Sequence, residues 1–237
     1  MLNIYKWGLK IALLTSVSIL SGCVSTTKDG TLGSKRKQFL ILPAAEYQAQ
    51  SLQAYSQIIN SAKSKKKVVT NSQVNRVAKK LIPYGREYRD DSADWKWEVN
   101  TIKSDELNAF VLSGGKIVVY TGIIEKLKLT DAELAAIIGH EMAHALREHG
   151  RERASYQMVT NLGLKYGSAV AGLSGDGQAI AQLITQYGLT LPNSRRHETE
   201  ADLVGLEIMA RAGYDPNAAI KVWEKMSQAT NNTSKTG

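Results

Sequence analysis

The stretch that most constrains this chain runs from Asp131 to His149 (DAELAAIIGHEMAHALREH). From Leu134 to Leu146 it is apolar on nearly every side, which predicts a buried helix. The side chains that interrupt this apolar pattern are His140, Glu141 and His144. Buried polar groups are costly without partners, so these three either satisfy one another in a core or bind something.

The spacing of these residues favours binding. His140 and His144 are four residues apart, so they lie one turn apart on the same helix face. In this His-Glu-x-x-His pattern two imidazoles hold zinc and the Glu between them serves as general base. Thr130 is a candidate N-cap for the helix, with Glu133 as its capping-box partner. His149 lies off the ligand face, and we expect it to be a surface or helix-end histidine.

A catalytic zinc ion needs a third protein ligand and one open position. Glu198 is the best candidate, because it lies 54 residues after His144 on a second predicted helix. Asp202 is one turn further on the same face, where it can accept a hydrogen bond from the other ring nitrogen of a ligand His. Glu200 is the rival ligand, but it points to another side of the helix. His197 also faces away from the Glu198 and Asp202 pair.

The remaining pattern predicts a mostly helical α+β domain with a small antiparallel sheet immediately before the His-bearing helix. Strands are indicated by alternating or continuous apolar residues, the last two joined by a Ser-Gly-Gly turn. The expected strands are 95–102, 108–112 and 116–120. The expected helices are 43–63, about 74–82, two between 158 and 191, about 192–211, and a last one after Pro216.

The N-terminus predicts export and lipid attachment. Residues 1–22 have a charged start and a short apolar run, as in a signal peptide. The run ends in Leu20-Ser-Gly-Cys23, which resembles a bacterial lipobox and implies cleavage before Cys23 and lipidation there. An ordinary signal peptide with a chance Cys, or a single-span anchor, is the alternative. We expect residues 23–40 to be the lipidated Cys and a flexible tether, and 41–237 to be a zinc metallopeptidase domain.

The location that follows is the bacterial cell envelope. Val24 follows the Cys where an Asp would favour the inner membrane, so we expect the outer membrane, facing the periplasm. The net charge of +8 comes largely from short lysine and arginine runs. Solvated loops explain these runs better than attraction to an anionic membrane does. The basic residues are scattered and no nucleic-acid motif is visible, so we expect no nucleic-acid partner.

Together the two motifs resemble the family 48 metallopeptidases, the HtpX-, Oma- and CaaX-protease-like gluzincins. The segments that carry the resemblance are His140-Glu-Met-Ala-His144 and Ser194-Arg-Arg-His-Glu198-Thr-Glu-Ala-Asp202, with Asn108-Ala-Phe and the glycine turn after it. It covers roughly residues 70–228, in the layout of the small lipoprotein members. It implies a zincin-like fold, one Zn²⁺ per chain, ligands at His140, His144 and Glu198, a base at Glu141 and support from Asp202.

The resemblance also implies endopeptidase activity, acting on unfolded, misfolded or misassembled envelope proteins as partners. Zinc would activate water and polarise the scissile carbonyl, and Glu141 would carry the proton to the leaving amine. We expect an extended substrate to add as a strand beside residues 116–120. The expected substrate-binding residues are Asn108, Lys116, Ile117, Val118, Val119 and Tyr120.

One departure from the family pattern leaves an alternative open. Family members usually carry a later His that is a candidate to stabilise the oxyanion, and this sequence has no His after His197. Arg195, Arg196, a Tyr or backbone N–H groups would have to serve instead. The alternative is a catalytically weak or inactive, chaperone-like lipoprotein that binds zinc. A purely structural lipoprotein with a chance motif is a third reading, against which the pairing of Glu198 with Asp202 argues.

Overall fold

The computed structural model describes residues 23–28, 30–32, 36–166 and 195–233. The predicted signal peptide and most of the helical region predicted between 158 and 191 lie outside the described residues. The described elements are β1 Cys23–Val24, β2 Gln38–Phe39, α2 Ala44–Ser64, β3 Val68–Val69, α3 Ser72–Leu81, two 3₁₀ turns (Ile82–Glu87 and Asp90–Ala93), β4 Glu98–Ile102, β5 Ala109–Leu112, β6 Lys116–Tyr120, α4 Thr121–Leu127, α5 Asp131–Leu146, α6 His149–Tyr166, α8 Arg195–Arg211 and α9 Ala218–Thr233.

The main sheet is mixed, with four strands in the order β3-β4-β6-β5. β3 pairs with β4 and β5 pairs with β6 in antiparallel fashion, but β4 and β6 are parallel. Gly114 and Gly115, both with positive φ, turn the chain so that β6 inserts between β4 and β5. Our prediction of an antiparallel sheet was therefore wrong. In the sequence, α4 also lies between the last strand of the sheet and α5, so the sheet does not immediately precede the His-bearing helix.

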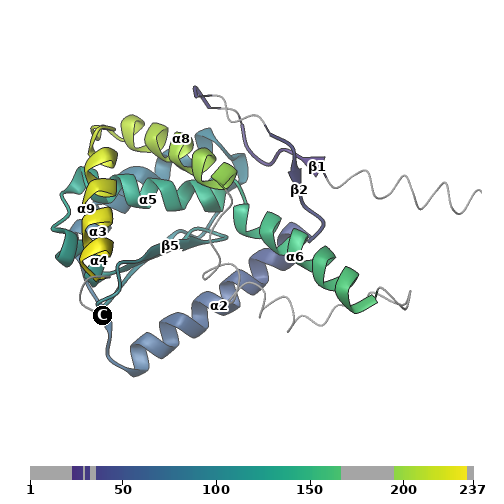
Figure 1. Ribbon diagram of the computed structural model, residues 1–237, viewed down its shortest axis with the longest axis horizontal. Helices are drawn as coiled ribbons and strands as arrows, with labels where there is room; N and C mark the ends of the chain where they lie inside the picture. Colours follow the sequence, from purple (N-terminus) through teal and green to yellow (C-terminus); the bar gives the residue numbers. More distant parts are fainter. Residues whose placement is uncertain (1–22, 29, 33–35, 167–194, 234–237) are drawn as a thin grey trace, which may run out of the picture.

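The strand β6 lies inside its sheet, between β4 and β5, and is buried on both faces. In Figure 1 this sheet, marked by the label β5, lies between α5 and α2. Successive side chains of a strand point to opposite faces. Ile117 and Val119 therefore pack in the cluster that contains α3, α5 and α8, whereas Val118 packs with residues of α2. The sheet thus separates α2 on one face from α3 and α5 on the other, and α8 and α9 pack on α5.

The helix α5 is the buried helix that the sequence predicts. Its N-terminus is closed by a capping box, in which Glu133 N–H donates to Thr130 Oγ1 and Thr130 N–H donates to the Glu133 carboxylate. Leu134, Ile138 and Met142 are almost completely buried in the main core. This packing fixes the position of the polar residues that α5 carries.

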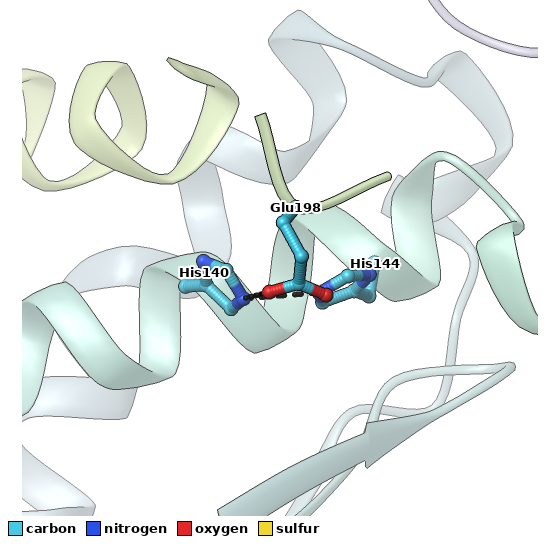
Figure 2. Close-up of side chains that lie close together, drawn as sticks. All are labelled: His140, His144 and Glu198. Carbon is cyan, nitrogen blue, oxygen red and sulfur yellow. Dashed lines mark hydrogen bonds and ion pairs between the residues drawn. The ribbon is translucent and has the colours of Figure 1, made fainter. Parts of the chain in front are cut away.

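The helices α5 and α8 approach closely at two glycines. A Cβ added to Gly139 would lie 2.9 Å from the carbonyl oxygen of Gly205, and one added to Gly205 would lie 2.7 Å from the backbone nitrogen of His140. A side chain at either position would therefore push the helices apart. The close approach brings the start of α8 over the histidines of α5 (Figure 2).

The described part of residues 25–40, which we call the arm, contacts the helices. Thr31 N–H donates to the Glu207 carboxylate at 2.9 Å, and the buried Gln38 amide donates to the carbonyl oxygen of Arg147 at 2.5 Å. Arg36 forms ion pairs with Glu152 of α6 and Glu200 of α8. These contacts hold part of the segment that we predicted to be a flexible tether, because its polar side chains are partners for charges on the domain. Among the described helices, none has the length and apolar character needed to cross a membrane.

Candidate metal centre

Three side chains converge on one point between α5 and α8 (Figure 2). The Nε2 atoms of His140 and His144 are 3.0 Å apart. Glu198 Oε2 lies 3.4 Å from His140 Nε2, and Glu198 Oε1 lies 3.5 Å from His144 Nε2. The histidine side chains are 12% and 11% exposed, whereas Glu198 is 40% exposed. The site is therefore enclosed on the side of α5 and open on the side of Glu198.

These residues fit a zinc ion. Tetrahedral zinc with bonds of about 2.0–2.1 Å places its ligand atoms roughly 3.4 Å apart, close to the separations measured here. One ligand atom from each residue lies within 4.8 Å of the others, with no other such group of three or more metal-binding side chains among the described residues. Two imidazoles and one carboxylate form a catalytic zinc donor set that leaves the fourth position for water.

Asp202 orients the first histidine. Its Oδ1 lies 2.8 Å from His140 Nδ1. An ionised carboxylate can only accept, so Nδ1 carries the proton and Nε2 faces the site. Although burial opposes the shift, the hydrogen bonds to Asp202 and Glu198 raise the pKa of His140 to about 10. A metal ion must therefore displace a proton from this ring.

Glu141 lines the same cavity as the three candidate ligands. Removal from water raises the pKa of Glu141 to about 7, with the charge of His140 lowering it and that of Glu198 raising it. A carboxylate that titrates near neutral pH can accept a proton and return it. Glu141 is therefore suited to proton transfer.

A cavity of about 190 Å³ opens beside these groups. Asn108, just before β5, and Ala109, the first residue of β5, line it. Much of the remaining wall is apolar and comes from α4, α5, α8 and α9: Ile123, Ile137, Leu206, Val222, Trp223 and Met226. The Trp223 ring also lies 6.0 Å from the His140 ring, centre to centre. A chain bound at the metal centre could therefore place an apolar side chain here.

Our prediction that a substrate adds as a strand beside residues 116–120 is wrong. β6, which consists of Lys116, Ile117, Val118, Val119 and Tyr120, pairs with β4 on one side and β5 on the other, so it has no free edge. Strand addition requires an exposed edge. Among the described strands, β5 is the edge next to β6, and its first residue, with the predicted Asn108 before it, borders the cavity.

His149, predicted to be a surface or helix-end histidine, lies at a helix end but not at the surface. It is fully buried at the start of α6, with Nδ1 2.8 Å from His144 Nδ1 and Nε2 3.0 Å from Glu200 Oε2. The intervening Glu148 has φ of 52°, in the left-handed region that non-glycine residues rarely adopt. The helix α5 has already ended at Leu146, so the helical spacing from His144 no longer gives the direction of His149.

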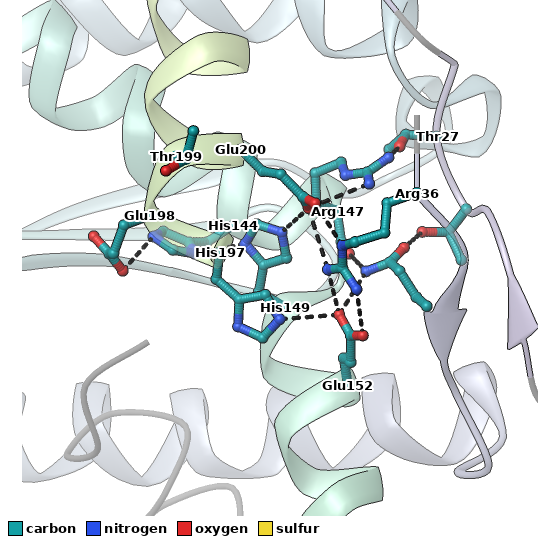
Figure 3. A network of polar contacts seen from close by, with 12 residues as sticks. Thr27, Arg36, His144, Arg147, His149, Glu152, His197, Glu198, Thr199 and Glu200 are labelled. Carbon is teal, nitrogen blue, oxygen red and sulfur yellow. Dashed lines mark hydrogen bonds and ion pairs between the residues drawn. The ribbon is translucent and has the colours of Figure 1, made fainter. Parts of the chain in front are cut away.

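Behind the metal centre lies a buried polar cluster that the sequence analysis missed (Figure 3). The His149 and His197 rings stack at 4.4 Å, and His197 Nε2 lies 3.0 Å from Glu152. Glu200, the rival ligand, lies in this cluster; although burial opposes it, hydrogen bonds from His149 and Arg36 lower its pKa to about 2. The repeated spacing His149-x-x-Glu152 and His197-x-x-Glu200 was the available signal. The cluster comprises Arg36, Arg147, His149, Glu152, His197 and Glu200.

Comparison with known proteins decides the family. The profile of Peptidase family M48 matches residues 69–236, which is most of the chain. The chain belongs to peptidase family M48. Metallopeptidases of this family are zinc enzymes, in agreement with the donor set described above.

The M48 chain is similar to metallopeptidases from several organisms. It is 38% identical over 160 residues to the mitochondrial metalloendopeptidase OMA1 of Schizosaccharomyces pombe, covering 68% of this chain and 45% of that protein. It is 27% identical over 223 residues to the metalloprotease LoiP of Escherichia coli K12, covering 92% of this chain and 85% of LoiP. The chain thus spans less than half the length of the OMA1 relatives and most of the length of LoiP.

Proposed function

We propose that this chain is a zinc-dependent endopeptidase that hydrolyses peptide bonds in misfolded or misassembled proteins of a bacterial cell envelope. The observation that carries this proposal is the convergence of His140, His144 and Glu198 on one point, with Glu141 beside them. Membership of family M48 supports it independently.

The roles of metal ligand, general base and orienting group fall to different residues. A zinc ion held by His140, His144 and Glu198 would lower the pKa of a bound water to about 7 and polarise the scissile carbonyl. Glu141 accepts the proton of the attacking water and then gives it to the leaving amine. Asp202 holds His140 with Nε2 toward the site. Arg195 and Arg196, at the start of α8, are both exposed.

The substrate side of the proposal rests on the edge of β5 and the adjoining cavity. An edge strand offers main-chain hydrogen bonds to an extended peptide, and such pairing depends little on the amino-acid sequence of that peptide. An apolar cavity beside the edge suits side chains that folded proteins keep buried. Both features support a preference for unfolded chains.

The envelope location rests on the lipobox-like segment and on relatives. LoiP of Escherichia coli aligns over most of both chains, and a second relative, 28% identical over 134 residues, is named β-barrel assembly-enhancing protease. The OMA1 relatives are named as mitochondrial, and the match covers less than half of each. We therefore propose lipid attachment at Cys23 and an outer-membrane location facing the periplasm.

The test compares the wild type with Glu141→Gln for zinc content and for cleavage of casein. We expect both proteins to bind zinc and the variant to lose about 10²–10⁴-fold in cleavage rate, because it lacks the base. Glu125→Gln, on the exposed face of α4, is the matched control and should cleave like the wild type.

The outcomes separate the candidate functions. Unchanged cleavage by Glu141→Gln would contradict the role of Glu141 as the general base. A wild type that binds zinc and unfolded casein without cleaving it would instead support the chaperone-like alternative. A wild type without bound zinc would contradict both.

A further inference from the structure

The two candidate histidine ligands are held by different partners. His140 Nδ1 lies against a carboxylate oxygen of Asp202, the usual outer partner of a metal-binding histidine. His144 Nδ1 lies instead 2.8 Å from another imidazole nitrogen, Nδ1 of His149. Two ring nitrogens form a hydrogen bond only when one carries a proton and the other does not. The direction of this bond decides whether His144 can bind a metal through Nε2.

The far side of His149 sets that direction. Its Nε2 lies 3.0 Å from Glu200 Oε2, and a carboxylate only accepts, so His149 Nε2 carries the proton. In a neutral ring Nδ1 is then the acceptor, and His144 Nδ1 must donate to it. The remaining nitrogen of His144, Nε2, then carries the lone pair, and it faces His140 Nε2 at 3.0 Å and Glu198 at 3.5 Å, where a metal would be held.

The charges of the buried polar cluster agree with a neutral His149. Arg36 pairs with both Glu152 and Glu200, and Arg147 pairs with Glu200, so two guanidinium groups balance two carboxylates. A second proton on His149 would add an uncompensated positive charge to a ring that is fully buried. The ring is also fixed in orientation, because it stacks on His197 with an interplanar angle of 13°.

We propose that His149 is a positioning residue of the metal centre. It accepts a hydrogen bond from His144 Nδ1–H and donates its own Nε2–H to Glu200, and so keeps His144 in the tautomer that binds metal through Nε2. This inference rests on the proposed zinc site, and it assigns to His149 and Glu200 together the role that Asp202 has for His140. The left-handed Glu148 makes the arrangement possible, because it turns His149 back toward α5.

The first test measures zinc affinity by competition with a chelator. His149→Phe keeps an aromatic ring to stack on His197 but removes both hydrogen bonds, and we expect a 10–100-fold weaker affinity. The matched control is His197→Phe, which removes a bond of 3.0 Å to Glu152, a member of the same cluster that is not a candidate ligand. We expect the control to change zinc affinity by less than about threefold.

The second test reads the tautomer directly in the metal-free protein. The chain has four histidines, so their ¹⁵N ring signals can be assigned by substitution. We expect His144 to be protonated at Nδ1 in the wild type and to shift toward the Nε2-protonated form in His149→Phe. A purely structural role of His149 would leave this tautomer unchanged.

A further pair of variants keeps the inference testable where His149→Phe does not fold. His149→Asn places an amide oxygen near the position of Nδ1 and retains an acceptor for His144, whereas His149→Gln places its amide near Nε2. We expect His149→Asn to bind zinc more tightly than His149→Gln. Equal affinities in this pair, or wild-type affinity and tautomer in a folded His149→Phe, would overturn the inference. Failure of the wild type to bind zinc would instead contradict the proposed function.

Discussion

Replacing Arg36 tests whether the arm is an integral part of the domain. Its guanidinium lies 2.5 and 2.6 Å from the two oxygens of Glu152 and 2.5 Å from Glu200. The three side chains are only 13%, 1% and 9% exposed. Arg36→Met keeps most of the aliphatic packing but leaves two buried carboxylates with fewer cationic partners.

The expected loss is large because the partners stay charged. Removing one member of a buried ion pair costs about 3–5 kcal/mol, since the remaining charge is uncompensated. Hydrogen bonds from His197 to Glu152 and from Arg147 to Glu200 remain, which favours the lower end of that range. For a chain of this size the midpoint of thermal unfolding should fall by on the order of 10 °C.

The arm offers its own control. Lys28 pairs with Asp90, but these side chains are 57% and 78% exposed. Because exposed pairs contribute about 0–1 kcal/mol, Lys28→Met should barely change stability. The assay is urea unfolding followed by circular dichroism, with the double variant Arg36→Met/Glu152→Gln to measure coupling. A loss below about 1 kcal/mol for Arg36→Met, no larger than that of Lys28→Met, would refute docking of the arm.

The same pair predicts a pH dependence. Although burial opposes it, hydrogen bonds from His197 and Arg36 hold the pKa of Glu152 well below its usual range. A carboxyl with a depressed pKa stabilises the fold above its unfolded pKa of about 4.3, and the contribution is lost as the pH falls further. The stability difference between wild type and Arg36→Met should therefore shrink below about pH 4.

Three further predictions concern the metal centre and the membrane. Gly205→Ala should lower zinc affinity at least about tenfold and destabilise the fold by about 1–3 kcal/mol, because its Cβ would separate α5 from α8; a stabilised variant with normal affinity would disprove the close approach. Zinc affinity, measured by chelator competition, should rise with pH between 6 and 8 by about tenfold per unit, because the metal displaces the proton of His140; a flat profile would contradict this. Cys23→Ser should move the protein from the membrane fraction to the soluble fraction, and retention at the membrane would disprove lipid anchoring at that residue.

Local patterns predicted the elements of this fold better than their arrangement. α2 lies within one residue of the predicted 43–63 helix, because apolar periodicity reports one face of a helix directly. The order of the strands depends instead on contacts between segments distant in the sequence. The continuous apolar run Ile117–Tyr120 was the one local sign of a strand buried on both faces.

The candidate site shows the same division. His140, His144, Glu198 and Asp202 lie as the spacing suggests, because residues four apart share a helix face. His149 escaped this reasoning, since nothing in the local sequence marks the residue before it for a left-handed conformation. Burial of the arm also escaped it, because the carboxylates that hold Arg36 lie more than a hundred residues away in the sequence.

The close crossing of α5 and α8 has a consequence for how this protein folds. His144 and Glu198 are 54 residues apart, so the ligand atoms meet only after a long segment has closed. Closing a loop of that length costs about 3–4 kcal/mol of chain entropy, apart from a constant. An ion that binds only the closed form, present at a concentration a thousand times its dissociation constant, stabilises that form by about 4 kcal/mol. Metal uptake would therefore act as a cross-link whose stabilisation is comparable to the entropy cost of closure, and it would report that α5 and α8 have packed together.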